Sequence, residues 1–429
     1  MGNKVIIVVR HEAMLSAQVA QVSARSASPV HSALAAYQGR RIALTQLAED
    51  LLRPTPNTTQ HAVTALNSVD MAVSFDAEPA APPSVTVLEG LGVLIVDEDD
   101  IDVASLADVD VLRVWPNMEL TLADPAIGQG TAPWHIAHVG QSFQARGAGT
   151  LIGVLDTGID THHPEFAGKK IHFAEFDMLG RKISTTPRDA GHHGTHVAGI
   201  AAGATCGVAP DADLAVAAVL TKKGPTGMSG SLDQIFGGLN WLITQEFRKD
   251  TPGVDVVNVS LGVGVAPGGP ARSGYNGFLS EVVRNTRLAP GILLIAAIGN
   301  DGERGEGFHG SPGNYDSVLA VGAIDRNDEV AAFSDWDRSW RIAGAPASIV
   351  KPDLCAPGVD VYSSVPGNAY RPLSGTSMAT PVVTGLAAVL LERDPSLRGD
   401  SGRLEARLRE LATRPVNPAA RGGAGRVHL

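Results

Sequence analysis

Five nearly continuous runs of small and branched apolar residues constrain the fold of this chain more than any other feature. They lie at 151–155, 214–219, 254–259, 292–297 and 318–324. A strand with one exposed face alternates apolar and polar residues, whereas a strand covered on both faces does not. Helix-like stretches separate or follow these runs, at 195–204, 231–247, 276–287, 378–393 and 402–412. Alternating buried strands and helices predict an α/β fold on a doubly wound, mostly parallel sheet.

The N-terminal part of the chain has a different pattern. A strand-like run at 5–9 and an Ala- and Leu-rich helical stretch at 32–52 are followed by proline-rich breakers at 54–57 and 78–83. A compact unit then combines a strand at 92–96, a short helix near 103–107 and a strand at 109–114. We therefore expect a smaller α+β domain at 1–123 and the α/β domain at 124–429.

Composition narrows the class of protein. The chain has 429 residues, of which 44 % are hydrophobic, enough for a large core. Acidic residues outnumber basic ones by 45 to 34 and Lys and Arg do not cluster, so nucleic acid is not an expected partner. No apolar run reaches the roughly 18 residues of a membrane-spanning helix, so no membrane association is expected.

The two cysteines, Cys206 and Cys355, lack metal-ligand spacing and are expected to be buried as small hydrophobic residues. The first apolar run is too short for a secretory signal, and no cleavage site follows it. The expected location is the cytoplasm, with reduced thiols. Secretion is the alternative if the start is truncated. The acidic stretch 97–102 resembles a calcium loop but lacks its Gly and final Glu, which favours a solvated face.

Four motifs place polar residues at the ends of predicted strands or at the starts of predicted helices. Asp156 ends an apolar strand before a Thr-Gly turn, where a partly buried carboxylate needs a partner, although such an Asp is often a turn former. His193 lies in GHHGTHVAG, where Gly194 is expected to leave open space beside the imidazole. Metal binding and a structural histidine cluster are the alternatives to a catalytic base there.

Ser377 begins an Ala- and Val-rich helix in GTSMATP. The positive end of that helix favours negative charge at an attacked carbonyl, while a simple N-cap is the alternative. Gly375 is expected to free the approach to the backbone. Asn300 follows the strand in AAIGN, either as a turn residue or as an amide that donates to an oxyanion.

Taken together, the motifs resemble those of the subtilisin-like (subtilase) serine proteases. The matching segments are DTGID at 156–160, HGTHVAG at 193–199, SLG at 260–262, AAIGN at 296–300 and GTSMATP at 375–381. The resemblance covers about residues 130–429. It implies that Ser377 attacks a peptide carbonyl, that His193 transfers its proton and that Asp156 orients the imidazole. Asn300 and the Ser377 backbone N–H would bind the oxyanion.

The resemblance also implies how a peptide substrate binds. The substrate would add as a β-strand along Ser260, Leu261 and Gly262, with Gly262 leaving room for backbone pairing. Small residues would form the walls and floor of the primary specificity pocket, so that a large apolar side chain fits before the scissile bond: Ala297, Gly299 and Gly310. Asp301 would lie near its rim, and Leu232 and Ile235 would line a second apolar pocket.

Four features depart from the family pattern. The loop at 200–210 is short, so the common calcium site and any cofactor are expected to be absent, even though Glu165 matches a frequent calcium ligand. Val382 replaces the usual His, and a segment at 335–349 with Trp336 and Trp340 replaces a short loop. No export signal is evident, although most of the family is secreted.

The N-terminal region resembles a subtilase propeptide, best at 92–122, and would act as intramolecular chaperone and inhibitor. Autocleavage between about 120 and 130 is our hypothesis. Two other functions fit the sequence less well: a silent binding protein, which would usually lack a triad residue, and a hydrolase of small esters, which would not need the SLG edge.

Overall fold

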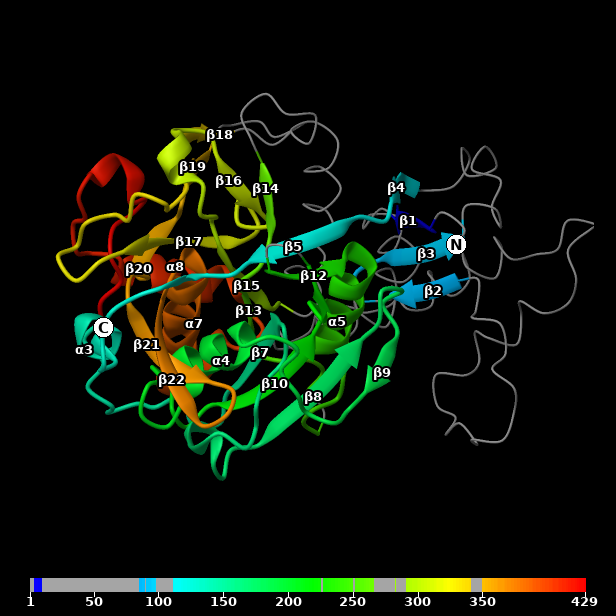
Figure 1. Cartoon of the computed structure of the whole chain (residues 1–429), viewed down its shortest axis with the longest axis horizontal. Coiled ribbons are helices and arrows are strands. Elements are labelled where there is room, and N and C mark those ends of the chain that lie inside the picture. The colour runs from blue at the N-terminus through cyan, green and yellow to red at the C-terminus, as the bar shows by residue number, and fades with distance from the viewer. Residues whose placement is uncertain are drawn as a thin grey trace, which may run out of the picture.

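The computed structural model describes residues 4–9, 85–88, 90–97, 111–224, 227–249, 251–265, 282, 291–340 and 349–429. The predicted helices at 32–52 and 103–107, nearly all of the one at 276–287, and most of the acidic stretch 97–102 lie outside these residues. Two main bodies are visible, a large α/β unit and a smaller sheet at one side of it (Figure 1).

The large unit is built on an eight-stranded sheet in the order β20-β17-β15-β13-β7-β10-β8-β9. Five strands match the apolar runs: β7 (Leu151–Asp156), β10 (Asp213–Ala218), β13 (Val256–Val259), β15 (Leu293–Ala297) and β17 (Leu319–Ile324). The sequence had not indicated β8 (Ile171–Phe176), β9 (Lys182–Ser184) and β20 (Leu354–Pro357). All pairings are parallel except the one between β8 and β9, which confirms the predicted fold class.

The order of the strands reverses beside β7. After β7 the chain builds β8 and β10 on one side, then returns to add β13, β15, β17 and β20 on the other. Ligands of doubly wound sheets bind at the carboxyl ends of the strands at such a switch point. Residues that follow β7, β13 and β15 are therefore brought to one place.

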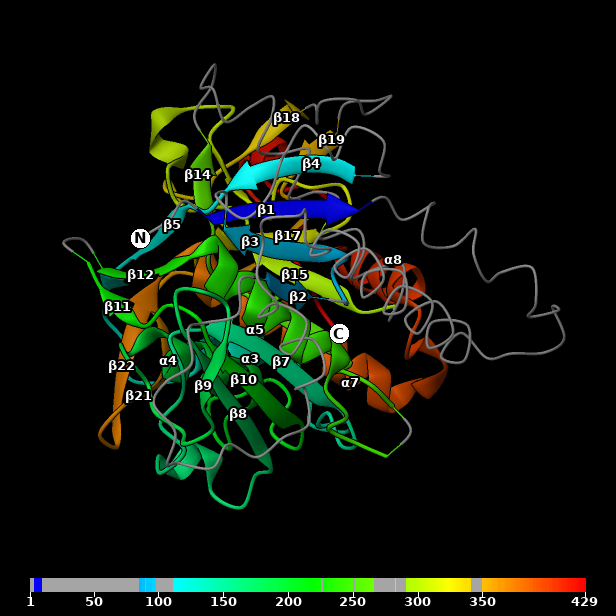
Figure 2. The same cartoon turned by 90° about the vertical axis from the view of Figure 1, so that its right-hand side faces the viewer.

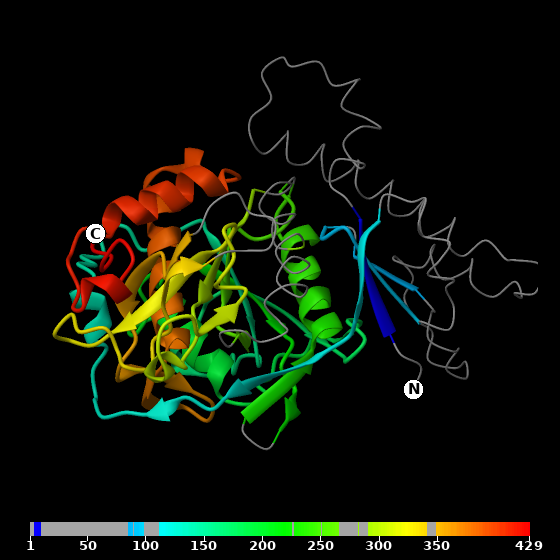
Figure 3. The ribbon, with the colours of Figure 1, turned by 90° about the horizontal axis from the view of Figure 1, so that it is seen from above.

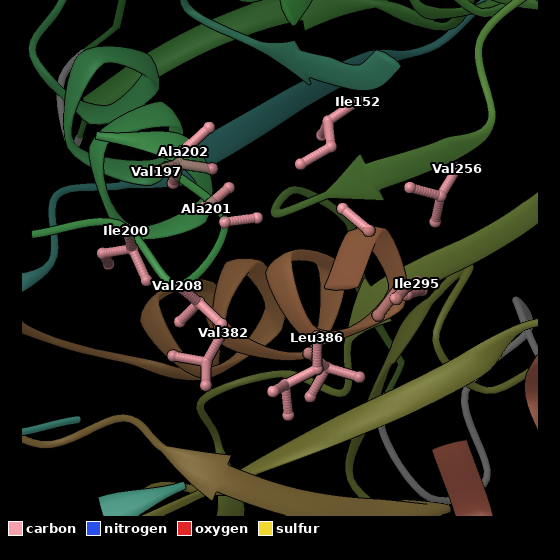
Figure 4. Packing of buried hydrophobic residues seen from close by; sticks show 14 of the residues in the cluster. Ile152, Val197, Ile200, Ala201, Ala202, Val208, Val256, Ile295, Val382 and Leu386 are labelled. Atoms are coloured by element: carbon pink, nitrogen blue, oxygen red, sulfur yellow. The ribbon is translucent and has the colours of Figure 1, made fainter. Parts of the chain in front are cut away.

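Helices cover both faces of the sheet. Two helices pack on one face, α4 (His193–Ala202) and α7 (Thr376–Arg393), where β7 contributes Ile152 and Val154 to their core. The close-up shows Ile152, Val256 and Ile295 directed at these helices (Figure 4). The other face carries α5 (Leu232–Thr244), which packs with Leu151 and Leu155 of the same strand. Burial of successive residues on opposite faces explains the uninterrupted apolar runs.

Helix starts differ from the sequence prediction by one or two residues. Helix α4 begins at His193 rather than Thr195, and α7 begins at Thr376 rather than Met378, with Gly375 as its N-cap. Ser231 caps α5, and Gln234 closes the capping box. The last long helix, α8 (Ser401–Leu411), also matches its prediction to within one residue at each end.

The smaller sheet has the order β2-β3-β1-β4, with antiparallel pairings. Its strands are β1 (Lys4–Val9), β2 (Val85–Leu88), β3 (Val93–Asp97) and β4 (Val111–Pro116). It packs against α5, as seen from above in Figure 3, and shares that helix's apolar cluster. A Cβ on Gly90 would lie 2.4 Å from Thr244 Cγ2, so the turn between β2 and β3 touches α5 directly.

After β4 the chain crosses from the smaller sheet to the large unit (Figure 2). It forms β5 (Glu119–Ala123), which pairs antiparallel with β12 (Gly227–Ser231), and β12 also pairs with β11 (Lys222–Lys223). It then forms β6 (Ala126–Ile127), which pairs with β22 (Ala369–Ser374), the partner of β21 (Val361–Val365).

Several shorter elements complete the large unit. They are α3 (Trp134–His138), the pair β14 (Val263–Val265) and β16 (His309–Ser311), the pair β18 (Asp337–Trp340) and β19 (Ile349–Lys351), and the 3-10 turns η3 (Pro164–Phe166), η5 (Gly302–Arg304), η6 (Pro395–Leu397) and η7 (Ala419–Arg421). In the part of the chain with assigned positions, none of the helices has the length and apolar character to span a bilayer.

Candidate active site

Asp156 and His193 form a buried pair at the switch point. His193 Nδ1 lies 2.8 Å from Oδ1 and 2.9 Å from Oδ2 of Asp156. The carboxylate also accepts a hydrogen bond from the Thr157 backbone N–H at 2.7 Å. The exposed fractions of Asp156 and His193 are 0 % and 3 %, so water does not screen the pair. A carboxylate on Nδ1 fixes the tautomer in which Nε2 can accept a proton.

Two opposing effects act on the imidazole of His193. Burial lowers the pKa of His193, while the charge of Asp156 and its hydrogen bond raise it, with smaller contributions from Asp189 and Asp124. The attraction prevails, and the pKa of His193 lies above its ordinary value of 6.5. The ring is therefore suited to take up a proton near neutral pH.

Gly194 serves a different purpose from the one predicted. A Cβ at this position would lie 2.1 Å from the Gly158 carbonyl oxygen, so the space is filled by backbone. The Gly194 N–H donates to Thr157 Oγ1 at 2.9 Å. The expectation of open space beside the imidazole was wrong, because the missing side chain instead lets the first turn of α4 pack on the turn after β7.

The neighbouring histidines have separate environments. His196 is fully buried, and its Nε2 lies 2.9 Å from the Arg371 carbonyl oxygen. Burial lowers the pKa of His196 to about 3, which leaves the ring neutral. Within the described ranges, His, Cys, Asp and Glu side chains form no group of three that could hold a metal. The geometry favours a structural role for His196.

Ser377 lies in the first turn of α7, next to the end of β13. Its Oγ donates to the Ser260 carbonyl oxygen at 3.1 Å, and Ser260 Oγ donates to the Ser377 carbonyl oxygen at 2.9 Å. Among the described residues, His193 Nε2 has no hydrogen-bond partner. The bond between Ser377 and His193 is therefore not made here. Such bonds are often long in unliganded enzymes, and rotation about the Ser377 Cα–Cβ bond redirects the hydroxyl.

Asn300 has a fixed amide orientation. Its Oδ1 accepts hydrogen bonds from the Thr376 backbone N–H at 2.9 Å and from Thr376 Oγ1 at 3.0 Å. A Cβ on Gly375 would lie 3.7 Å from both Asn300 Nδ2 and the Ser377 backbone nitrogen. These two nitrogens thus border the same small space, which the absent side chain of Gly375 leaves open, as expected.

Of the predicted substrate-binding residues, Ser260 contacts Ser377, and the segment 260–262 is less open than expected. Ser260 and Leu261 are buried, and a Cβ on Gly262 would lie 2.5 Å from the Ser311 carbonyl oxygen. The prediction that Gly262 leaves room for a substrate backbone needs this correction, because β16 occupies the space where its side chain would be. Leu232 and Ile235 pack in one apolar cluster with Leu120 of β5.

The residues predicted for the primary pocket lie together near Asn300. Ala297 ends β15 and is 8 % exposed, and a Cβ on Gly310 would lie 3.6 Å from Gly299 Cα. Gly299 has a φ of +119°, a conformation that favours glycine. The side chain of Asp301 is 47 % exposed, in agreement with a position at a rim.

Glu165 has protein partners at the position where calcium was considered. Its carboxylate accepts hydrogen bonds from the Thr205 and Cys206 backbone N–H groups at 2.7 and 3.1 Å, from the Tyr370 hydroxyl at 2.8 Å, and from the Thr205 hydroxyl. Burial raises the pKa of Glu165, but these donors outweigh it and the pKa is lowered. Cys206 and Cys355 are buried and unpaired, as predicted.

Sequence reasoning missed Asp189, which joins the two elements that carry Asp156 and His193. One oxygen accepts from Thr157 Oγ1 at 2.7 Å, and the other accepts from Thr195 N at 2.8 Å and Thr195 Oγ1 at 2.6 Å. An Asp shortly before a helix start is a general sign of N-terminal capping and could have drawn attention to it. Thr376, which orients Asn300, was also missed.

Comparison with known proteins identifies the family. The sequence model of the subtilase family matches residues 147–425, well over half of the chain. The chain belongs to the subtilase family. This subtilase has strands, helices and motifs in the order that the resemblance implied, so the recognition from sequence and the assignment to serine proteases are confirmed.

Curated relatives agree with the family assignment. Subtilisin DY of Bacillus licheniformis is 38 % identical over 274 residues, which are 62 % of this chain and 85 % of that protein. A thermostable alkaline protease of Halalkalibacterium halodurans is 34 % identical over 333 residues, 75 % of this chain and 77 % of that protein. The subtilisin-like protease PopC of Myxococcus xanthus is 37 % identical over 59 % of this chain, and the match spans about half (53 %) of its length.

A solved structure supports the fold independently. A cold-adapted subtilisin-like serine proteinase aligns with a TM-score of 0.52 at 24 % identity, over 70 % of this chain and 97 % of its own. At that identity the likeness concerns the fold.

Proposed function

We propose that this subtilase is an endopeptidase with Asp156, His193 and Ser377 as its catalytic triad. The observation that carries the proposal is the buried pair of Asp156 and His193, whose Oδ1 and Nδ1 atoms are 2.8 Å apart at the switch point. Ser377, in the first turn of α7, is hydrogen-bonded to Ser260 directly after the neighbouring strand β13. Ser377 attacks the carbonyl carbon, and His193 Nε2 takes the hydroxyl proton and passes it to the leaving amine. Asp156 stabilises the imidazolium that forms in between.

The oxyanion is bound by two N–H donors, Asn300 Nδ2 and the Ser377 backbone. Support comes from the space beside Gly375 that both nitrogens border, and from Thr376, which holds the amide oxygen of Asn300 on the opposite side. Hydrogen-bond donors that are already oriented stabilise the developing charge without reorganisation.

A fluorophosphonate probe and a peptide library test this proposal together. The wild-type protein should be labelled on Ser377 and should cleave peptides, whereas Ser377→Ala should do neither. Ser260→Ala serves as the matched serine control and should still be labelled. Labelling without peptide cleavage would instead favour a hydrolase of small esters, and the absence of both would favour a silent binding protein.

The preferred substrate carries a large apolar side chain before the scissile bond. Support comes from the family resemblance and from the small residues Ala297 and Gly310 near Asn300. The missing side chain of Gly299 adds no room, because a Cβ there would lie 2.0 Å from Asp335 Oδ2. An extended substrate lies along β12 and the segment Ser260–Gly262. Digestion of a denatured proteome with sequencing of the cleavage sites tests this preference, and a majority of cuts after charged residues would contradict it.

The N-terminal region occupies the substrate cleft as an inhibitor and is cut from the 124–429 domain by the enzyme itself. Support comes from the strand register. Ala123 pairs with Gly227 at the end of β5, and Ala126 pairs with Ser374, three residues before Ser377. Leu120 belongs to the same apolar cluster as Leu232 and Ile235, the residues predicted to line the second apolar pocket.

Only Asp124 and Pro125 lie between these two pairings, and Asp124 acts electrostatically on His193. We therefore place the scissile bond between Ala123 and Asp124, inside the window predicted from the sequence, where the residue before the bond is small and not the large apolar residue preferred in other substrates. Intact mass after expression should give a chain that starts at residue 124 for wild type and an uncut chain for Ser377→Ala. An uncut wild-type chain would refute the autoprocessing.

Catalysis by this subtilase requires no metal or other cofactor. The hydrogen bonds that Glu165 accepts from Thr205, Cys206 and Tyr370 support this, because they use the lone pairs that a calcium ion would need. Treatment with a chelator should leave the rate of peptide hydrolysis and the melting temperature unchanged. A chelator-dependent loss of either would contradict the proposal.

A further inference from the structure

Asp335 lies directly behind the turn that carries Asn300. Its side chain is 1 % exposed, and its Oδ1 accepts a hydrogen bond from the Asp301 N–H at 2.6 Å. Its own backbone N–H donates to the Gly299 carbonyl at 3.1 Å, and the Gly302 N–H donates to the Phe333 carbonyl at 2.8 Å. The turn is therefore bonded to segment 333–335 on both sides of Asn300.

The second oxygen of this carboxyl packs against the turn itself. A Cβ on Gly299 would lie 2.0 Å from Asp335 Oδ2, so this oxygen contacts the α carbon of the residue before Asn300. Within the described part of the chain, no hydrogen-bond donor reaches Oδ2. A charge on this oxygen would have no direct partner, which is costly in a buried position.

The groups that face Asp335 come from two elements. Asp301 and Arg304 belong to the same turn and its 3-10 continuation η5, and Arg421 belongs to η7, where its guanidinium donates to the carbonyls of residues 331, 332 and 334. The pKa of Asp335 is raised to about 8, mainly by burial and also by the negative charge of Asp301. The hydrogen bond from Asp301 N and the charges of Arg421 and Arg304 act in the opposite direction.

We propose that Asp335 is a positioning residue for the oxyanion site and acts as a neutral acid that clamps the Gly299–Asp301 turn. In this role it holds Asn300 toward the reacting carbonyl and keeps negative charge away from the developing oxyanion. This inference rests on the proposed function, since it assumes that Asn300 binds the oxyanion. Ionisation of Asp335 would place a buried negative charge beside the turn that carries Asn300 and oppose the transition state.

The expected signature is an alkaline limb in kcat. A neutral Asp335 supports catalysis at pH 7, so kcat should fall as pH rises through about 8, while KM changes little. Among the other described groups, the thiol of Cys355 has its pKa raised by burial to about 12, and burial also raises the pKa of Cys206, so neither thiol produces this limb.

Two matched substitutions separate the charge from the clamp. Asp335→Asn keeps an oxygen for the Asp301 N–H and cannot ionise, so the alkaline limb should disappear while kcat at pH 7 stays within about twofold of wild type. Asp335→Ala removes the clamp and should lower kcat at pH 7 by about tenfold or more, as expected when a buried hydrogen bond is lost. Asp301→Asn removes a neighbouring negative charge and should move the limb to lower pH.

Two results would overturn the proposal. One is an unchanged alkaline limb in Asp335→Asn, and the other is wild-type kcat at pH 7 in Asp335→Ala. Thermal unfolding gives a readout that does not depend on catalysis. Folded Asp335 retains its proton between about pH 4 and pH 8 and the unfolded chain does not, so wild type should lose stability relative to Asp335→Asn as pH rises through that window. If that loss is seen but no peptide is cleaved, the proposed function fails and the buried acid stands. If the stabilities of wild type and Asp335→Asn instead change with pH in the same way, folded Asp335 does not keep its proton, and the proposal of a neutral buried acid is wrong.

Discussion

On the β7 side of the switch point, Asp156 and His193 are already joined, and Asp189 fixes the elements that carry them. On the β13 side, Asn300 is held by Thr376, but the Ser377 hydroxyl donates to the Ser260 carbonyl and not to His193. In the proposed mechanism the Asp156–His193 pair is thus already bonded, whereas Ser377 must exchange its hydrogen bond to Ser260 for one to His193. The difference teaches that the proposed acid–base pair is held by its own hydrogen bonds before a substrate binds, whereas the proposed nucleophile is held by a competing carbonyl.

The largest effect should come from removing a triad member on either side. Ser377→Ala should lower kcat by about 10⁶-fold and Asp156→Asn by about 10⁴-fold, by analogy with the losses known for the triads of subtilisin, a member of the same family, and of other serine proteases. Active-site-titrated hydrolysis of a chromogenic peptide measures both. Equal losses of kcat for the two variants would mean that Asp156 does more than orient the imidazole of His193.

Loss of the oxyanion amide should come next. Asn300→Ala should lower kcat by about 100- to 1000-fold with little change in KM, again the range known for subtilisin. Thr376→Val removes one of the two hydrogen bonds that orient the amide and should cost less, about tenfold. A larger loss for Thr376→Val than for Asn300→Ala would show that Thr376, and not Asn300, is the main contributor.

The pH dependence of kcat/KM tests the side that carries Asp156 and His193. Here we expect a shift of the pH midpoint, which changes the rate less than the losses above. His193 must be neutral to accept a proton, and its pKa is raised. We therefore expect kcat/KM to increase with pH, and the midpoint of this increase to lie above pH 6.5. Asp189→Asn removes a negative charge that raises this pKa and should move the midpoint to lower pH. Asp177→Asn, in the turn between β8 and β9, is the control and should leave it in place. A shift to higher pH in Asp189→Asn would contradict the electrostatic account.

The smallest effect should come from Ser260, which directly follows β13 and bonds to Ser377. Ser260→Ala removes the hydrogen bond to the Ser377 carbonyl but keeps the backbone oxygen to which Ser377 donates. A neutral hydrogen bond contributes about 0.5–1.5 kcal/mol, so kcat should fall by about tenfold or less. A much larger loss would mean that Ser260 does more than fix the start of α7.

Much of the site followed from the sequence because each motif is local. A strand end, a helix start and a Gly-containing turn are all visible within a few residues, and their order along the chain matched a known family. Glycine roles were less predictable. Gly194 and Gly262 were expected to give access, but backbone from Gly158 and Ser311 fills both spaces, and only a folded chain shows what approaches a missing side chain.

Several expectations stay predictions. They include the boundary between the domains 1–123 and 124–429, the absence of a metal, and the cytoplasmic location with secretion as its alternative. The inhibitory role of the N-terminal region also belongs here, although the strand register supports it. Each depends on processing, ions or compartments and not on the fold.

By itself the sequence determined the α/β class, the five buried strands and the identity of the triad candidates, because periodicity and short motifs are encoded within single elements. Only the tertiary structure decided which distant groups meet. Asp189 and Asp335 lie in loops with no motif of their own, and each gains its role from a backbone N–H that the fold brings within hydrogen-bond distance. Such contacts depend on the packing of several elements at once, and no local pattern of residues records them.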